Sequence, residues 1–339
     1  MTRFLAMIPP HAIRRSLLLA LGLLFAGCSS SEEETPVPDA GVEDPPTGDP
    51  KVLAGSFQVL LVASTPASGG SPATPGYTSV VGKVYDGAIP SQIVWEKAAQ
   101  SGDCQLLTPR VPFCNTPCGG SAVCVENDTC QPYPTSRSVG SVHVQGLRAA
   151  SGATEFSMDP VANNYQPPTS VDLPFPAFSE GDTIRADAAG SYYPAFSVQT
   201  RGIAPLELLN STIRIEQNQP VTLNWKAPGQ ADLSKIHVKL DISHHGGTRG
   251  MIECDAADTG SLQLPATLVT QLLNLGAAGY PTVIVARKAV GSTTIAPGRV
   301  DLVVSSEVEH AVEIPGLVSC SENSQCPGGQ TCRADLTCG

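Results

Sequence analysis

Charged residues are scarce in this chain. Lys, Arg, Asp and Glu together make up 15% of its 339 residues, against about 25% in an average soluble domain. Basic residues are fewer than acidic ones, with 20 Lys and Arg against 31 Asp and Glu, so the net charge is −11. So few basic groups cannot neutralise a run of phosphates, which argues against nucleic acid as a partner.

Long hydrophobic runs and familiar catalytic motifs are also missing. The apolar run LLLALGLLFA at 17–26 has ten residues, whereas a membrane-spanning helix needs about 20. The chain has no G-x-S-x-G, Walker A, G-x-G-x-x-G or H-E-x-x-H sequence. Serine hydrolases and nucleotide enzymes usually carry one of these. We therefore expect no enzyme activity and no cofactor.

The first 28 residues carry the features of an export signal. Arg3, Arg14 and Arg15 precede the apolar run, whose length is that of a signal-peptide core. The run ends in Phe25-Ala26-Gly27-Cys28, which resembles a bacterial lipobox. The resemblance implies cleavage after residue 27, lipidation of Cys28 and a membrane anchor there. It also implies a place in the bacterial cell envelope, at the outer membrane or the cell surface. The alternative is an ordinary secretory signal.

An acidic tether is expected to follow the anchor. Residues 29–50 contain seven acids, five prolines and no base. Such a segment cannot bury enough apolar surface to offset its ordering entropy, and its prolines and like charges keep it extended. Several acyl chains on Cys28 would anchor it stably, because each buried CH₂ contributes about 0.8 kcal/mol.

Short strands are expected from Lys51 onward. In Val221–Trp225 and Ile236–Ser243 the apolar residues alternate with polar ones, which is typical of half-buried antiparallel strands. Further runs of this kind lie at 57–62, 80–85, 93–95, 139–144, 154–158, 183–186, 212–215, 281–286 and 300–304. Many short strands at this spacing favour β-sandwiches. A stripe of leucines predicts a single helix at 266–275.

The fold class predicted is therefore mostly β. We expect two antiparallel β-sandwich-like domains, one short helix and small disulfide-rich knobs. The expected segments are a signal peptide (1–27), a tether (28–50), an N-terminal β domain (51–175) with a cysteine-rich insertion (104–134), a C-terminal β-sandwich domain (176–316) and a cysteine-rich module (317–339). The boundary between the β domains is placed in the Pro-rich segment 166–176.

Eleven cysteines argue for an oxidising compartment. Besides Cys28, eight of them form two groups of four: Cys114, Cys118, Cys124 and Cys130, and Cys320, Cys326, Cys332 and Cys338. A shift of 208 residues brings three cysteines of one group onto three of the other. The segments CGGSAVCVENDTC and CPGGQTCRADLTC are therefore two copies of one unit. Cys104 and Cys254 remain; they would pair with each other, or Cys104 would pair within the first group.

The second copy, SCSENSQCPGGQTCRADLTCG at 319–339, resembles Dickkopf-type or EGF-like cysteine-rich modules. The resemblance implies a loop-rich knob with two disulfides and no catalysis. Four cysteines allow three pairings, and the resemblance favours first with third and second with fourth. The alternative is a zinc site, but zinc ribbons use C-x₂₋₄-C pairs and an exported chain favours disulfides.

One short sequence suggests a protease. Asp258-Thr259-Gly260-Ser261 matches the active-site loop of aspartic proteases. Two such aspartates must face each other and share a proton. The chain has one such loop, so activity would require a homodimer. The alternative is a turn that leads from a strand toward the helix.

One loop suggests a metal-dependent hydrolase. The candidate metal ligands lie on an expected hairpin and are Asp241, His244, His245 and Glu253. His237 and Asp241 would stand about 13 Å apart on a strand, too far to share an ion. His244 could meet Glu253 or Asp255 across the hairpin. The alternative is a solvated hairpin loop.

Taken together, these features favour a lipid-anchored surface protein with a binding, adhesion or structural role. Its expected partners are the membrane, through Cys28, and a protein or glycan at the cell surface. The alternative function is a cell-envelope hydrolase, metal-dependent at His244 and His245 or aspartic protease-like at Asp258.

Overall fold

The computed structural model describes residues 48–67 and 71–339. All of them belong to one compact unit, Pro45–Gly339. The signal peptide, Cys28 and most of the expected tether lie outside the described residues. Within the described ranges, no helix combines the length and the apolar character needed to cross a membrane.

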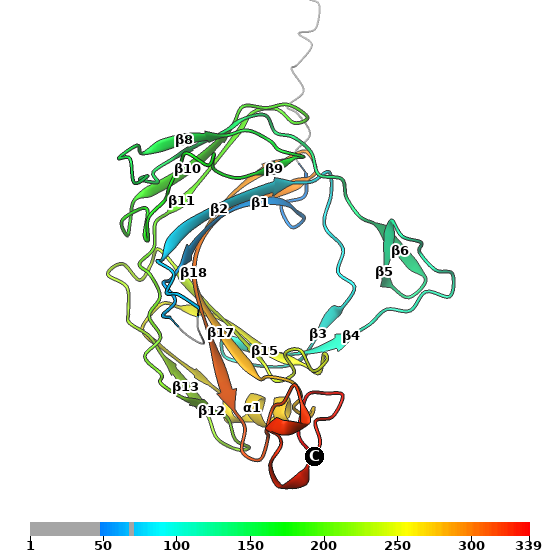
Figure 1. Cartoon of the computed structure of the whole chain (residues 1–339). Helices are drawn as coiled ribbons and strands as arrows, with labels where there is room; N and C mark the ends of the chain where they lie inside the picture. The colour runs from blue at the N-terminus through cyan, green and yellow to red at the C-terminus, as the bar shows by residue number, and fades with distance from the viewer. Residues whose placement is uncertain (1–47, 68–70) are drawn as a thin grey trace, which may run out of the picture. The chain divides into compact units, whose positions relative to one another are not determined.

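A ten-stranded sheet is the framework of the unit (Figure 1). Its strands are β1 (Leu53–Val62), β2 (Tyr77–Val84), β3 (Val94–Ser101), β4 (Cys104–Arg110), β9 (Asn164–Tyr165), β12 (Ile213–Arg214), β14 (Lys235–Asp241), β15 (Met251–Ala257), β17 (Thr282–Ile295) and β18 (Gly298–Glu313). They follow the order β3-β4-β15-β14-β17-β18-β1-β2-β9, and β12 pairs with the end of β18. Pairing is antiparallel except where β1 and β12 lie parallel to β18.

Three smaller sheets complete the unit. A four-stranded sheet has the order β11-β10-β7-β8, and two-stranded sheets are formed by β13-β16 and β5-β6. Their bounds are β5 (Ala122–Glu126), β6 (Thr129–Pro132), β7 (Val142–Gln145), β8 (Glu155–Met158), β10 (Thr183–Ala188), β11 (Phe196–Arg201), β13 (Val221–Asn224) and β16 (Ser261–Leu264). The helix α1 (Ala266–Leu273) follows β16, and two short 3₁₀ turns, Asn323–Gln325 and Pro327–Gly329, lie near the C-terminus.

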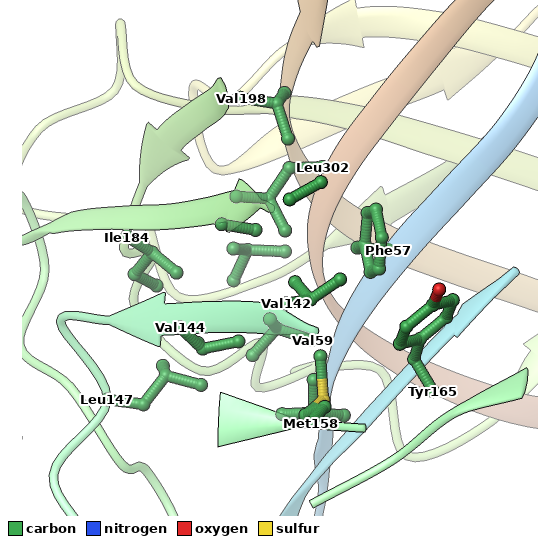
Figure 2. Packing of buried hydrophobic residues seen from close by; sticks show 14 of the residues in the cluster. Phe57, Val59, Val142, Val144, Leu147, Met158, Tyr165, Ile184, Val198 and Leu302 are labelled. Atoms are coloured by element: carbon green, nitrogen blue, oxygen red, sulfur yellow. The ribbon is translucent and has the colours of Figure 1, made fainter. Parts of the chain in front are cut away.

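One hydrophobic core lies between the four-stranded sheet and one half of the large sheet. Phe57 of β1 and Leu302 of β18 belong to the same buried cluster as Val144 of β7 and Ile184 of β10 (Figure 2). Alternate residues of each strand point inward because side chains in a strand alternate between its two faces. Tyr165 packs its ring edge on Phe57, with ring centroids 5.7 Å apart.

A second core lies on the other half of the large sheet. It joins Val238 of β14 and Val285 of β17 to Leu223 of β13 and to Leu268 and Leu272 of α1. The predicted leucine stripe is therefore the buried face of the helix. Pro265 stands at its N-cap, and Gly276 follows its end with φ of +87°.

For the described residues, the prediction of a mostly β chain with antiparallel sheets, one short helix and small disulfide-rich knobs is confirmed. The two sandwich-like domains that were expected are two cores within one compact unit. The two cores nevertheless share one sheet: β1 and β2 pair with β18, and β4 pairs with β15. The expected boundary at residues 175/176 therefore does not separate two sheets. The alternation of apolar residues reveals a strand but not its partner, because pairing depends on contacts far apart in the sequence.

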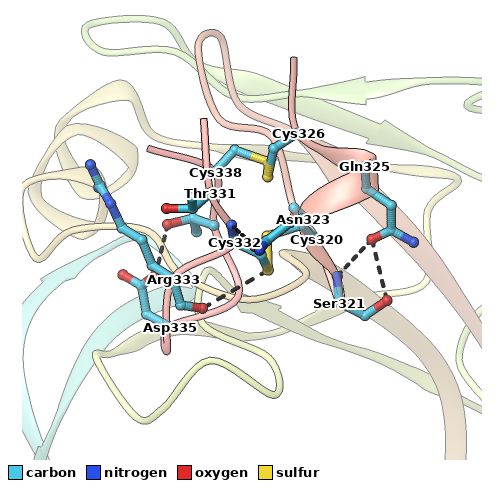
Figure 3. Close-up of a disulfide and its surroundings, with 12 residues drawn as sticks. Cys320, Ser321, Asn323, Gln325, Cys326, Thr331, Cys332, Arg333, Asp335 and Cys338 are labelled. Carbon is cyan, nitrogen blue, oxygen red and sulfur yellow. Dashed lines mark hydrogen bonds between the residues drawn. A yellow bond between two sulfur atoms is a disulfide. The ribbon is translucent and has the colours of Figure 1, made fainter. Parts of the chain in front are cut away.

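Both disulfide knobs are present, and they are built alike. The first has the bonds Cys114–Cys124 and Cys118–Cys130, and the second has Cys320–Cys332 and Cys326–Cys338 (Figure 3). The pairing of first with third and second with fourth, implied by the resemblance, is confirmed. Cys124 lies opposite Cys130, and Cys332 lies opposite Cys338. Asp128 and Leu336, which are 208 residues apart, both have φ of 59°. The sequence repeat is therefore a structural repeat.

The second knob is attached to the body, next to the end of α1. The amide of Gly279 donates to the carbonyl of Asp335 at 2.7 Å, and the hydroxyl of Ser319 donates to the carbonyl of Gly279. Cys320 is fully buried. These contacts fix the C-terminal module to the unit.

The fifth disulfide lies inside the large sheet. Cys104 of β4 and Cys254 of β15 are direct cross-strand partners, with Cα atoms 4.1 Å apart. The expected cysteine-rich insertion at 104–134 therefore begins too early, since residues 104–110 form a sheet strand.

Candidate functional site

A notch in the large sheet holds the clearest cavity with titratable side chains. The antiparallel pair β14 and β15 stops at Lys235 and Ala257, and Lys235 lies opposite Lys288 of β17. β17 continues beyond this point to Ile295, paired with β18. A cavity of about 660 Å³ lies at the step. Its charged or titratable lining residues are Asp103, Asp232, Lys235, His237, Asp255 and Lys288.

His237 and Asp255 form a cross-strand pair in this notch. Nδ1 of His237 lies 2.9 Å from Oδ1 of Asp255. The imidazole is 25% exposed and the carboxylate 75% exposed. A carboxylate in this position holds a histidine ring in one orientation, as in the orienting half of a catalytic triad.

Ser234 lines the same cavity but is not available as a nucleophile. It is buried, and its hydroxyl donates to Oδ2 of Asp258 at 2.7 Å. A nucleophile must instead donate its hydroxyl hydrogen bond to the base. His237 and Asp255 therefore do not form a triad with Ser234.

The predicted metal ligands do not converge. Asp241 accepts hydrogen bonds from the amide and hydroxyl of Ser243, and Glu253 lies opposite Lys239. His244 and His245 follow the end of β14, and their rings lie against each other with centroids 3.9 Å apart and planes tilted by 51°. Across the described ranges, the groups of three metal-ligating atoms close enough for one ion all come from cysteines. The hypothesis of a metal site at these four residues is therefore not supported: Asp241 and Glu253 are not cross-strand partners, and His244 and His245 lie in the loop between the paired strands.

The cysteine groups are equally unsuited to a metal. They are Cys114, Cys118 and Cys130, and Cys320, Cys326 and Cys338. Every one of these sulfurs is in a disulfide. Zinc is bound by thiolates, so the zinc alternative does not apply to these knobs in the oxidised protein.

Asp258 serves the core and not a protease site. It is fully buried, and its carboxylate accepts hydrogen bonds from Nε1 of Trp225 at 2.7 Å, from Ser234, and from Nη2 of Arg287 at 3.0 Å. A carboxylate enclosed in this way cannot face its counterpart in a second copy. The aspartic protease-like hypothesis is therefore wrong; the short motif marks the turn between β15 and β16.

Arg287 is the partner that the sequence analysis missed. It is fully buried, and besides Asp258 it donates to the carbonyls of Ala204, Pro205 and Lys226. One side chain thus ties three loops to β17. The signal was in the alternation of β17, which places Arg287 on the same face as the buried Val283 and Val285.

A second charged cluster links β2 to two surface loops. The backbone amide of Thr135 and the guanidinium of Arg137 donate to Asp86 and hold the pKa of its carboxyl below the usual value of 3.8. The guanidinium carbon of Arg137 also lies 4.5 Å from the ring centroid of Tyr192. Burial raises the pKa of the neighbouring Tyr193 to about 12.

Comparisons with protein families and with curated proteins give no match. No protein-family model matches the chain, and no curated protein matches it. Among solved structures, it is similar to the chicken CNTN1 FN1-FN3 domains at 7% identity, over 78% of this chain and 90% of that chain, with a TM-score of 0.19. That score is too low to place this chain in the fold of that structure.

Proposed function

We propose that this chain is a lipid-anchored protein of the bacterial cell envelope with a binding or structural role, and that it is not an enzyme. The sequence at 25–28 supports the anchor. The state of the cysteines supports a location outside the cytosol, because all ten cysteines that follow Cys28 are in disulfides. Disulfides of this number persist outside the reducing cytosol.

The non-enzymatic role is supported by the structural contacts of the candidate catalytic side chains. Asp258 is enclosed by donors, and Asp241 caps the turn at Ser243. The disulfide knobs stiffen loops, which favours presentation of a surface over chemistry. The expected partners are the membrane, through Cys28, and a protein or glycan outside the cell.

The anchor is tested by metabolic labelling with an alkyne fatty acid, followed by membrane fractionation. The natural chain and a Ser29→Ala control should take up the label and sediment with membranes. Cys28→Ala should take up no label and keep its leader. Label on the Cys28→Ala chain, or none on the natural chain, would overturn the proposal.

A further inference from the structure

The notch contains two lysines in an unfavourable arrangement. Lys235 and Lys288 lie directly opposite each other on neighbouring strands, and both line the cavity. Like charges in directly opposed positions destabilise a sheet. Among the described residues, the lysine that forms an ion pair is Lys226, with Glu207, so neither ammonium group in the notch is neutralised by a carboxylate in contact with it.

The rest of the lining limits what could neutralise the two lysines. The carboxylate of Asp255 is bonded to His237, and Asp103 and Asp232 also line the cavity. Three carboxylates nearby disfavour an anion of high charge, since its repulsion by them grows with each added charge. The lining holds two lysines against three aspartates, so it disfavours a polyanion overall. A ligand of low charge can still place a single carboxylate at the two lysines.

Apolar side chains lie beside the lysines. Leu233 and Val290 both line the cavity, and Val290 is 56% exposed. An apolar group of a ligand would gain by covering this surface. The cavity volume of about 660 Å³ lies within the range of about 300–1,000 Å³ that small-molecule sites occupy.

We propose that the notch binds an organic monocarboxylate. Its carboxylate lies between the ammonium groups of Lys235 and Lys288, and its apolar part covers Leu233 and Val290. This inference rests on the binding role proposed above and gives that role a ligand class. It does not depend on the lipid anchor.

The test measures thermal unfolding with three probes: benzoate, acetate and inorganic phosphate, each against sodium chloride at equal ionic strength. The chain is produced from residue 28 with Cys28→Ser, so that no detergent competes for an apolar ligand; the compact unit begins at Pro45. We expect benzoate to raise the melting temperature saturably. Acetate should need at least a tenfold higher concentration for the same shift, because its methyl group covers far less apolar surface than a phenyl ring.

Matched variants identify the site. Lys235→Gln and Lys288→Gln should each weaken benzoate binding at least tenfold. Lys239→Gln is the control, since this lysine lies on the same strand and is not part of the cavity lining. Without ligand, Lys235→Gln and Lys288→Gln should melt no lower than the natural sequence, because the repulsion between the lysines is removed.

Several results would overturn the inference. They are no stabilisation by benzoate, an equal loss in Lys239→Gln, stabilisation by phosphate but not benzoate, and a lower melting temperature for either notch variant without ligand. Each leaves the fatty-acid labelling of Cys28 unaffected. A failed anchor and a failed ligand site can therefore be told apart.

Discussion

Replacing Asp258 with alanine should destabilise the fold strongly. The substitution leaves the guanidinium of Arg287 buried without its counter-charge; its side chain is 1% exposed. Removing one partner of a buried ion pair costs about 3–5 kcal/mol. Trp225 and Ser234 lose their acceptor at the same time, and each unsatisfied buried group costs about 1–3 kcal/mol, not additively. We therefore expect a loss of at least about 3 kcal/mol, out of the roughly 5–15 kcal/mol typical of folded proteins.

Urea unfolding under non-reducing conditions, followed by tryptophan fluorescence, measures this loss. Asp255→Ala is the control three residues earlier in the chain. Its carboxylate is 75% exposed, and exposed pairs contribute about 1 kcal/mol or less. The double variant Asp258→Ala with Arg287→Met should be more stable than the sum of the single losses predicts, because it removes the stranded charge.

Two results would refute this reasoning. A loss below about 1 kcal/mol for Asp258→Ala would mean that the carboxylate does not compensate a buried charge. Additive losses in the double variant would mean that Asp258 and Arg287 do not interact.

Three further predictions follow from contacts elsewhere in the unit. Asp86→Asn should destabilise the protein at neutral pH, and the difference should fade as pH drops below 3.8, because a lowered folded pKa gives stability that is lost when the folded carboxylate is protonated. Joint replacement of Cys104 and Cys254 by alanine should lower stability by about 2–5 kcal/mol in thermal unfolding. Gly82→Ala should cost about 1–3 kcal/mol, because its new methyl group would lie 2.2 Å from the buried ring of Phe57.

Each of these three predictions can be contradicted by one measurement. A pH-independent deficit in Asp86→Asn would show that its carboxyl does not titrate differently in the folded state. Free thiols at the sheet cysteines in non-reducing mass mapping would remove the cross-strand bond. Gly87→Ala is the control for Gly82, since the nearest atom to its methyl group is 3.8 Å away; equal losses in the two variants would contradict the packing argument.

Local patterns in the sequence were enough to predict many elements. The alternation in 221–225 and 236–243 corresponds to β13 and β14, and the leucine stripe to α1. The repeat of cysteines predicted two similar knobs. The information for each strand, for the helix and for each single knob lies within about twenty residues, whereas the likeness of the two knobs appears only when segments 208 residues apart are compared.

Other features depend on residues far apart in the chain. β16 was missed because its four residues form a strand only by pairing with β13, about forty positions earlier. The shared sheet depends on β1 pairing with β18 across most of the chain. The predicted metal site is absent for the same reason. Asp241, His244 and Glu253 are close in the sequence, but the pairing of β14 with β15 decides which side chains lie next to each other. The lysines of the notch meet only through that register.

The parallel pairing of β1 with β18 has a mechanical consequence. Leu53 lies opposite Arg299 and Leu61 opposite Ser306, so the chain enters at one end of this pair and leaves β18 toward the C-terminal knob at the other. A pull on the N-terminus against a partner held at the knob would slide β1 along β18. Sliding loads the whole row of backbone hydrogen bonds together, whereas peeling would break them one at a time. The arrangement therefore resists tension between the start of β1 and the C-terminal knob.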